Sequence, residues 1–382
     1  MGMEMMRAAL ASGVPVSEVL GGAAPLNELS DVVESVELVV AEEARRNLGV
    51  FQEAASQLKR LLREGGRPAQ FLAAQKLLED TTRGISWKPQ EATMPLPSNY
   101  HLASALNRVD SNVGRELGLL EELVAISSIS CEPEEAKEVR HSAEWVAQKM
   151  REANFANVRL LEAEGVHPAV YGEIIVDPNK STILFYAHHD VMPLADNGKG
   201  WETDPFKAIV RNGRLYGRGA ADDKAGFISG LAAIKAYGQN LPVNVVFLIE
   251  GEEETGSENL DRLLAQLPPD LKIDAALLAN SENSEETSDP WVGDFEHPIT
   301  NVLAGAFAMG YGQPNSVLAG TGGSIGFLPT FKKRFPNTPL YCIGIEDPDT
   351  NAHAANESLS ISDFWRTIRS LVFFFHAMGN RT

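Results

Sequence analysis

Residues 183–257 carry three apolar runs, and each run ends in residues that can bind a metal or move a proton. The runs lie in ILFYAHHDVMP (183–193), GWETDPFKAIVRNGRLYGRGAADDKAG (200–226) and VNVVFLIEGEEETGS (243–257). His188 and Asp190 close the first run, Asp222 and Asp223 follow the second, and Glu253 and Glu254 close the third. Imidazole and carboxylate groups are the ligand types found in metal hydrolases. This stretch therefore predicts a metal site at one edge of a sheet.

Strand and helix patterns alternate around this stretch. Runs rich in β-branched and aromatic residues predict strands at 158–161, 169–175, 182–186, 243–249, 275–279 and 340–345. Helical spacing of apolar residues predicts helices at 113–129, 133–153, 224–237, 260–267 and 361–378. The alternation predicts an α/β fold, a layered sheet with ligands at the carboxyl ends of its strands.

The N-terminal part of the chain has a different pattern. Apolar residues recur at spacings of three and four from residue 26 to residue 65, so we expect residues 1–86 to form an all-helical extension. Prolines without periodicity make residues 87–107 a linker, and residues 108–382 form the second domain. We interpret the extension as a packing or oligomerisation module; a cover over the active site is the alternative.

Composition excludes several classes of function. The 382 residues carry a net charge of −19, whereas a protein that binds nucleic acid needs a basic face. No apolar run approaches the length of a membrane span, and the first residues lack the apolar segment of a signal peptide. We therefore expect a cytoplasmic protein that contacts neither membranes nor nucleic acids. The cysteines, Cys131 and Cys342, form no disulfide framework, and we expect both thiols to be reduced and buried.

The candidate site residues can take different roles. His188 can offer a neutral imidazole nitrogen to a metal, and Asp190, two residues later, could hold the other ring N–H. The carboxylate of Asp222 could bridge two metals. Neighbouring carboxylates in different environments can divide into a ligand and a general base, which suits Glu253 and Glu254, although an acidic run is more often a solvated surface. His353, in NAHAANE, is a further candidate ligand.

Residues from about 110 to 382 resemble the dinuclear zinc peptidase and deacylase family of carnosinase, aminoacylase, acetylornithine deacetylase and succinyl-diaminopimelate desuccinylase. The resemblance rests on AHHDVMP, GRLYGRGAADDKAG, EGEEETGS, GGSIG and NAHAANES, which follow the family's order. It implies a three-layer α/β/α zinc-exopeptidase-like catalytic domain that binds two divalent ions, with Zn²⁺ expected and Co²⁺ or Mn²⁺ as alternatives.

The resemblance also implies a role for each site residue. It places His188 and Glu254 on different metals, Asp222 between the two metals, and His353 on the second metal. It makes Glu253 the general base that takes a proton from water. Asp190 then orients the imidazole of the first ligand.

The chain departs from this family at the first metal. Asn280 stands where family members have an acidic ligand, so Asn280 could be a weak ligand, Glu282 could replace it, or the first site could be empty. Further along, Gly320 occupies the place of a carboxylate-binding arginine, and Gly326 and Ala355 replace prolines.

The segment after this position is also unusual. About 40 residues separate Asn280 from Gly322, so the family's lid and dimerisation domain is missing near residues 291–301. Gly322, Gly323 and Ser324 could bind a substrate anion through backbone N–H groups and a hydroxyl, or could form an ordinary turn.

These features together predict a metal-dependent hydrolase that cleaves the amide bond of a dipeptide or an N-acyl amino acid. One alternative is a repurposed metalloenzyme that forms amides or carries out another carbonyl reaction. The other is a non-catalytic scaffold with a degenerate metal site. The expected partners are a small peptide or N-acyl amino acid substrate and a second copy of the chain, bound through the N-terminal helices.

Overall fold

The computed structural model describes residues 100–194, 198–280, 293–294, 296–316 and 327–381. The chain divides into two compact units, Met1–Gly114 and Arg115–Thr382, and the second is described here by itself. The expected helical extension lies outside the described residues. So do Glu282, Gly322, Gly323 and Ser324, whose proposed roles remain predictions.

A six-stranded sheet forms the centre of the second unit, in the order β1-β2-β6-β3-β7-β8. Strands β3, β6, β7 and β8 run parallel, whereas β2 pairs antiparallel with both β6 and β1. The central strands are buried on both faces, which explains their unbroken apolar sequences. The strands span Ala156–Leu161 (β1), Ala169–Ile174 (β2), Thr182–His188 (β3), Asn244–Glu250 (β6), Ala275–Leu278 (β7) and Leu340–Cys342 (β8).

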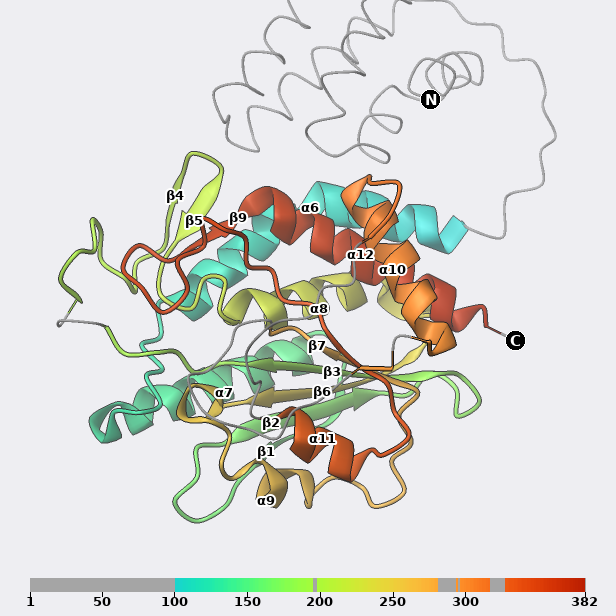
Figure 1. Ribbon diagram of the computed structural model, residues 1–382, viewed down its shortest axis with the longest axis horizontal. Coiled ribbons are helices and arrows are strands. Elements are labelled where there is room, and N and C mark those ends of the chain that lie inside the picture. Colours follow the sequence, from blue (N-terminus) through green and yellow to red (C-terminus); the bar gives the residue numbers. More distant parts are fainter. Residues whose placement is uncertain (1–99, 195–197, 281–292, 295, 317–326, 382) are drawn as a thin grey trace, which may run out of the picture. The chain divides into compact units, whose positions relative to one another are not determined.

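Helices cover both faces of this sheet (Figure 1). On one face α7 (Ala136–Glu152) packs on β1 and β2, and α8 (Lys224–Tyr237) packs on β3. Behind α8 lies α12 (Ile361–Gly379), which packs against α10 (Pro298–Tyr311). The other face is covered by α9 (Leu260–Leu264) and α11 (Leu328–Arg334), where the Tyr186 ring meets Phe327 and Phe331 at 4.5 and 5.2 Å. This arrangement confirms the predicted α/β/α layers.

A second, smaller sheet joins two distant segments of the chain. It has the antiparallel order β4-β5-β9, with bounds Ile209–Arg211, Arg214–Tyr216 and Ser358–Ser360. The loop after β5 leads to Asp222 and the loop before β9 contains His353. Because β5 and β9 are hydrogen-bonded neighbours, the small sheet brings these two loops together. Short 3₁₀ turns complete the elements at Pro133–Glu135, Gly238–Asn240 and Glu253–Thr255.

Several element boundaries differ from the sequence predictions. Helix α8 has the predicted bounds, but the helix expected at 113–129 is α6, which spans Tyr100–Val124. Residues 100–107 are therefore helical, although the prediction placed them in the linker; no proline follows Pro97 to interrupt them. Helix α10 was missed, although it begins with a proline, which favours the first turn of a helix.

Two further observations concern the surface. Both Cys131 and Cys342 are exposed, so the expectation of buried thiols was wrong. Cys342 ends β8, a strand at the edge of the sheet, and Cys131 follows the buried Ile129 and Ser130. Among the described helices, none combines the length and the apolar character needed to cross a membrane.

Candidate metal centre

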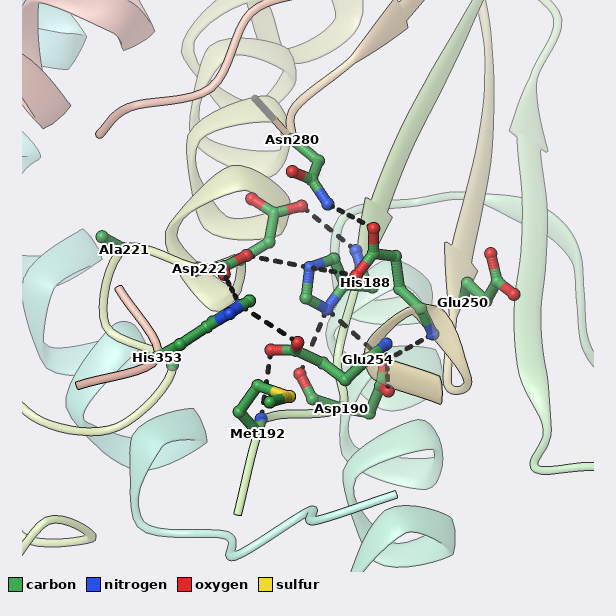
Figure 2. A network of polar contacts seen from close by, with 12 residues as sticks. His188, Asp190, Met192, Ala221, Asp222, Glu250, Glu254, Asn280 and His353 are labelled. Carbon is green, nitrogen blue, oxygen red and sulfur yellow. Dashed lines mark hydrogen bonds and ion pairs between the residues drawn. The ribbon is translucent and has the colours of Figure 1, made fainter. Parts of the chain in front are cut away.

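Three neighbouring parallel strands deliver site residues to the same edge of the sheet. His188 is the last residue of β3, Glu253 follows β6, and Asn280 follows β7. Because the carboxyl ends of parallel strands lie side by side, these side chains meet, and Figure 2 shows His188 and Asn280 at this edge. The Nε2 atom of His188 lies 3.7 Å from Glu253 Oε2, and Asn280 Nδ2 donates to Glu253 Oε1 at 2.8 Å.

The carboxylate of Asp222 lies between the two candidate histidine ligands, as Figure 2 shows. Its Oδ1 is 3.1 Å from His188 Nε2 and its Oδ2 is 2.8 Å from His353 Nε2. His353 Nε2 also lies 3.2 Å from Glu254 Oε2. We call His188 with Asp222 Oδ1 the His188 half-site, and His353 with Asp222 Oδ2 and Glu254 the His353 half-site. One carboxylate with an oxygen toward each half-site has the geometry of a bridging ligand.

Asp190 holds two parts of the site at once. Its Oδ1 lies 3.4 Å from His188 Nδ1, although that nitrogen is closer, at 3.1 Å, to the Asp190 backbone carbonyl. The same carboxylate accepts the backbone N–H groups of Glu253 and Glu254, at 3.3 and 3.1 Å. Asp190 therefore fixes the acidic turn as well as the imidazole, a second role that the sequence did not suggest.

The charges of the site perturb one another strongly. Burial raises the pKa of Glu253 well above its usual value, and the nearby carboxylates of Glu254 and Asp222 raise it further. Burial and Asp222 raise the pKa of Glu254 to about 7. Hydrogen bonds to Asp222 and Glu254 raise the pKa of His353 to about 11. Carboxylates packed this closely repel each other, and a positive charge at the centre relieves that repulsion. A divalent cation supplies such a charge.

Exposure and backbone conformation single out His353. The His353 side chain is 30 % exposed, against 0 % for His188 and 2 % for Asp222, so the site opens to solvent beside His353. His353 also has a φ of 61°, a left-handed conformation that is uncommon for a residue other than glycine. Such conformations cluster at functional sites because the surrounding structure must hold them.

Comparison with known proteins identifies the family. A model described as "Peptidase family M20/M25/M40" matches residues 184–376, which is half of the chain. The chain belongs to peptidase family M20/M25/M40. The match runs from within β3 into the last turn of α12 and includes every described candidate site residue. It confirms the family resemblance predicted from the sequence motifs.

Individual M20 relatives match shorter parts of the chain. The human "Beta-Ala-His dipeptidase" is 46 % identical over 102 residues, which cover 26 % of this chain and 20 % of the relative. The "Cys-Gly metallodipeptidase DUG1" of Saccharomyces cerevisiae is 29 % identical over 182 residues, which cover 44 % of this chain and 38 % of the relative. The chain thus spans between about a fifth and two fifths of the length of these two curated relatives.

Solved structures support the fold. A crystal structure of human carnosine dipeptidase 1 superposes with a TM-score of 0.66 at 17 % identity, and covers 75 % of this chain and 100 % of the other. The dipeptidase Dug1p of Saccharomyces cerevisiae gives the same TM-score at 16 % identity, with 74 % and 99 % of the two chains covered. At these identities the likeness establishes that this M20 chain has the M20 fold.

The donor set of this M20 chain fits a divalent cation. One oxygen or nitrogen from each of His188, Asp222 and Glu254 lies within 4.8 Å of the others, a cluster that could hold a metal ion. The His353 half-site joins two carboxylate oxygens and an imidazole nitrogen, all of them atoms that zinc binds. The family resemblance implies the division of these ligands between two metals, which remains a prediction.

Glu357 supports the site in a way that the sequence did not reveal. Its buried carboxylate accepts the backbone N–H groups of Gly219, Ala221 and Asp222, at 2.9 to 3.2 Å, and pairs with Arg218 at 2.9 Å. Glu357 directly precedes β9, in the same loop as His353, and it therefore links the Asp222 loop to the His353 loop. The sequence signal for the residue, although not for its contacts, was an acid within the NAHAANES motif.

Two further buried acids adjoin the site, and the sequence had assigned neither of them a role. Asp223, next to Asp222 along a cis peptide bond, accepts the backbone N–H of His188 at 3.1 Å. Glu250, the last residue of β6, accepts the hydroxyl of Tyr186 at 2.7 Å. Both lie within motifs quoted above, GRLYGRGAADDKAG and EGEEETGS, and an acid at the end of a fully apolar strand was the signal for Glu250.

Proposed function

We propose that this chain is a metal-dependent hydrolase that cleaves the amide bond of a dipeptide or an N-acyl amino acid. One observation carries the proposal: the carboxylate of Glu253, 13 % exposed, faces a cluster of His and carboxylate ligands at the edge of an M20 fold. The dipeptidase names of the human and yeast relatives support this substrate class. They do not favour amide formation or a non-catalytic scaffold.

The proposed cofactor is zinc, with up to two ions shared between the half-sites. His353, Glu254 and Asp222 would hold one ion, and His188 with the other oxygen of Asp222 would contribute to a second. Co²⁺ or Mn²⁺ could occupy the same donors. A bound divalent cation would polarise the substrate carbonyl and make water more acidic.

The protein residues then have defined tasks. Glu253 accepts a proton from the attacking water, whose oxygen forms a bond to the carbonyl carbon. The same proton passes to the amide nitrogen as the C–N bond breaks, so that a carboxylic acid and an amine leave. The raised pKa of Glu253, caused by burial and neighbouring carboxylates, makes this side chain a stronger base than an exposed glutamate. Asp190 keeps that base in place through the two backbone N–H groups.

The proposed partners are small molecules and a second copy of the chain. Gly322, Gly323 and Ser324 would bind an anionic group of the substrate. The helical N-terminal extension would provide contacts between copies. The net charge of −19 argues against a nucleic-acid partner, and a cytoplasmic location with no membrane partner remains our expectation.

Glu253→Gln tests the proposed function. With β-Ala-His and Cys-Gly as substrates and added Zn²⁺, we expect this variant to lose about 10²- to 10⁴-fold in kcat, because the general base is gone. Bound zinc, measured by elemental analysis, should stay unchanged. The matched control is Glu258→Gln, an exposed acid of the same segment, which should keep full activity. Full turnover by Glu253→Gln would show that the base is misassigned, and no hydrolysis of any dipeptide by the wild type would contradict the proposed function.

A further inference from the structure

We propose that this chain holds one divalent metal ion tightly, at the His353 half-site, and that Asn280 positions Glu253 in place of ligating a second ion. The inference rests on the proposed function, because it concerns the same base and the same cofactor. The sequence left open whether Asn280 is a weak ligand, whether Glu282 replaces it, or whether the first metal site is empty.

The two half-sites offer unequal sets of donors. The His353 half-site has one imidazole nitrogen and two carboxylate oxygens, with contacts of 2.8 and 3.2 Å among them. The His188 half-site has one imidazole nitrogen and the other oxygen of Asp222. Glu254 also lies within 4.8 Å of these two groups, but it is a carboxylate that the His353 half-site already uses. Among the described residues, the strand end after β7 adds the amide of Asn280, which is 1 % exposed. Zinc binds thiolate, imidazole and carboxylate groups, and an amide in place of a carboxylate removes one negative charge from this buried pocket.

The orientation of the amide also opposes metal binding. Asn280 turns its Nδ2 atom toward Glu253 Oε1 at a distance of 2.8 Å. A general base must be ionised when it accepts a proton, and an ionised carboxylate can only accept hydrogen bonds, so the amide presents its NH₂ group there. That NH₂ group cannot bind a cation, and the amide oxygen is neutral, which makes it a weaker ligand than a carboxylate. The contact therefore uses Asn280 to hold the base.

An aspartate at the same position would behave differently. It would place two carboxylate oxygens about 2.8 Å apart, a separation that like charges tolerate only with a cation or a proton between them. An asparagine needs neither, because its N–H bonds the carboxylate directly. The residue at position 280 thus determines whether a second cation is needed beside Glu253. With asparagine at this position, no second cation is needed.

Metal counting tests the inference with the full chain. The protein is stripped with a chelator, Zn²⁺ alone is titrated back by calorimetry, and tightly bound zinc is measured by elemental analysis. We expect about one equivalent for the wild type and about two for Asn280→Asp, which restores a carboxylate ligand. Asn280→Ala, which removes the amide without adding a ligand, should stay at about one. It should also lower kcat by about tenfold or more at unchanged KM, because the base loses its anchor while substrate binding does not change.

Glu282→Gln addresses the competing ligand. If Glu282 does not replace the missing carboxylate, this variant also binds about one equivalent. About two tight equivalents in the wild type would overturn the inference, and a fall to about one in Glu282→Gln would assign the second site to Glu282. If the wild type hydrolyses dipeptides and binds two equivalents of zinc tightly, only this inference is overturned. One equivalent without hydrolysis overturns only the proposed function, and no bound zinc overturns both.

Discussion

At the scale of single residues, Glu250 makes the stability of this protein depend on pH. Burial, reinforced by the charge of Asp190, raises the pKa of Glu250 to about 7, and the side chain is fully buried. Between the usual pKa of a glutamate and about pH 7, the unfolded chain loses this proton while the folded chain keeps it. The contribution of Glu250 to stability is therefore largest at low pH and is lost as the pH rises through that window.

Glu250→Gln should remove this dependence. The glutamine oxygen can still accept the Tyr186 hydroxyl, and no charge remains to bury. In metal-free protein we expect the variant to match the wild type near pH 4.5 and to exceed its free energy of unfolding by up to about 3 kcal/mol above pH 7. Chemical denaturation across this pH range measures the difference. A constant difference at every pH would show that Glu250 titrates normally.

The sequence predicted the site residues correctly where a motif lies close to the end of a strand. His188, Asp222, Glu254 and His353 were expected in one cluster, and their side chains meet within hydrogen-bond distances. Asn280 was recognised as a departure, but its contact with Glu253 could not be predicted, because it depends on how closely β6 and β7 end on either side of β3.

At the scale of elements, the site depends on a tie between two loops. Glu357, before β9, binds three backbone N–H groups of the loop that carries Asp222, together with Arg218. Sequence patterns could not reveal this tie, because backbone groups leave no signature and the partners lie at least 135 residues away. The small sheet was missed for a related reason, since its three strands have only three residues each.

Glu357→Gln should lower both the stability of the protein and its metal affinity, although the substitution replaces none of the candidate metal ligands. The change leaves the buried Arg218 without its charge partner, which should cost about 3–5 kcal/mol of unfolding free energy. Metal affinity should fall about 10- to 100-fold, as for other residues that hold ligands in place. Calorimetric titration with Zn²⁺ and thermal unfolding measure the two effects.

An exposed ion pair provides the control for this element. Glu202 pairs with Arg211 at 2.7 Å, but both side chains are largely exposed. Glu202→Gln should change stability by less than about 1 kcal/mol and leave zinc binding intact. If Glu357→Gln behaved like this control, the two loops would hold their positions without the buried carboxylate.

At the scale of the whole molecule, the order of the motifs was enough to predict the layered fold. Alternating strands and helices require crossover connections, and these place the strand ends, and hence the motifs, at one edge of the sheet. The helices α10 and α11 were harder to predict, because α10 contains two glycines and α11 has only seven residues. No lid-sized domain fits between Asn280 and α10, where the sequence has only residues 281–297.

Metal binding should therefore act on the stability of the whole second unit, since its ligands come from segments spread between β3 and β9. A ligand that binds only the folded chain adds about 2.7 kcal/mol when its concentration is 100 times its Kd. We expect Zn²⁺ to raise the unfolding temperature of chelator-treated protein by several degrees, and excess chelator to reverse the rise. Mg²⁺ at the same concentration controls for cations that merely screen the net charge of −19, and it should have little effect.

The rise in unfolding temperature with Zn²⁺ should also disappear when a ligand of the His353 half-site is removed. Glu254→Gln removes the carboxylate that lies 3.2 Å from His353 Nε2, and it also relieves repulsion with Asp222, so the metal-free variant should be at least as stable as the wild type. Its unfolding temperature should then stay nearly constant when Zn²⁺ is added. An equal zinc-dependent rise in Glu254→Gln and wild type would place the stabilising ion elsewhere on this acidic chain, because a ligand cannot be dispensable for an ion that it holds.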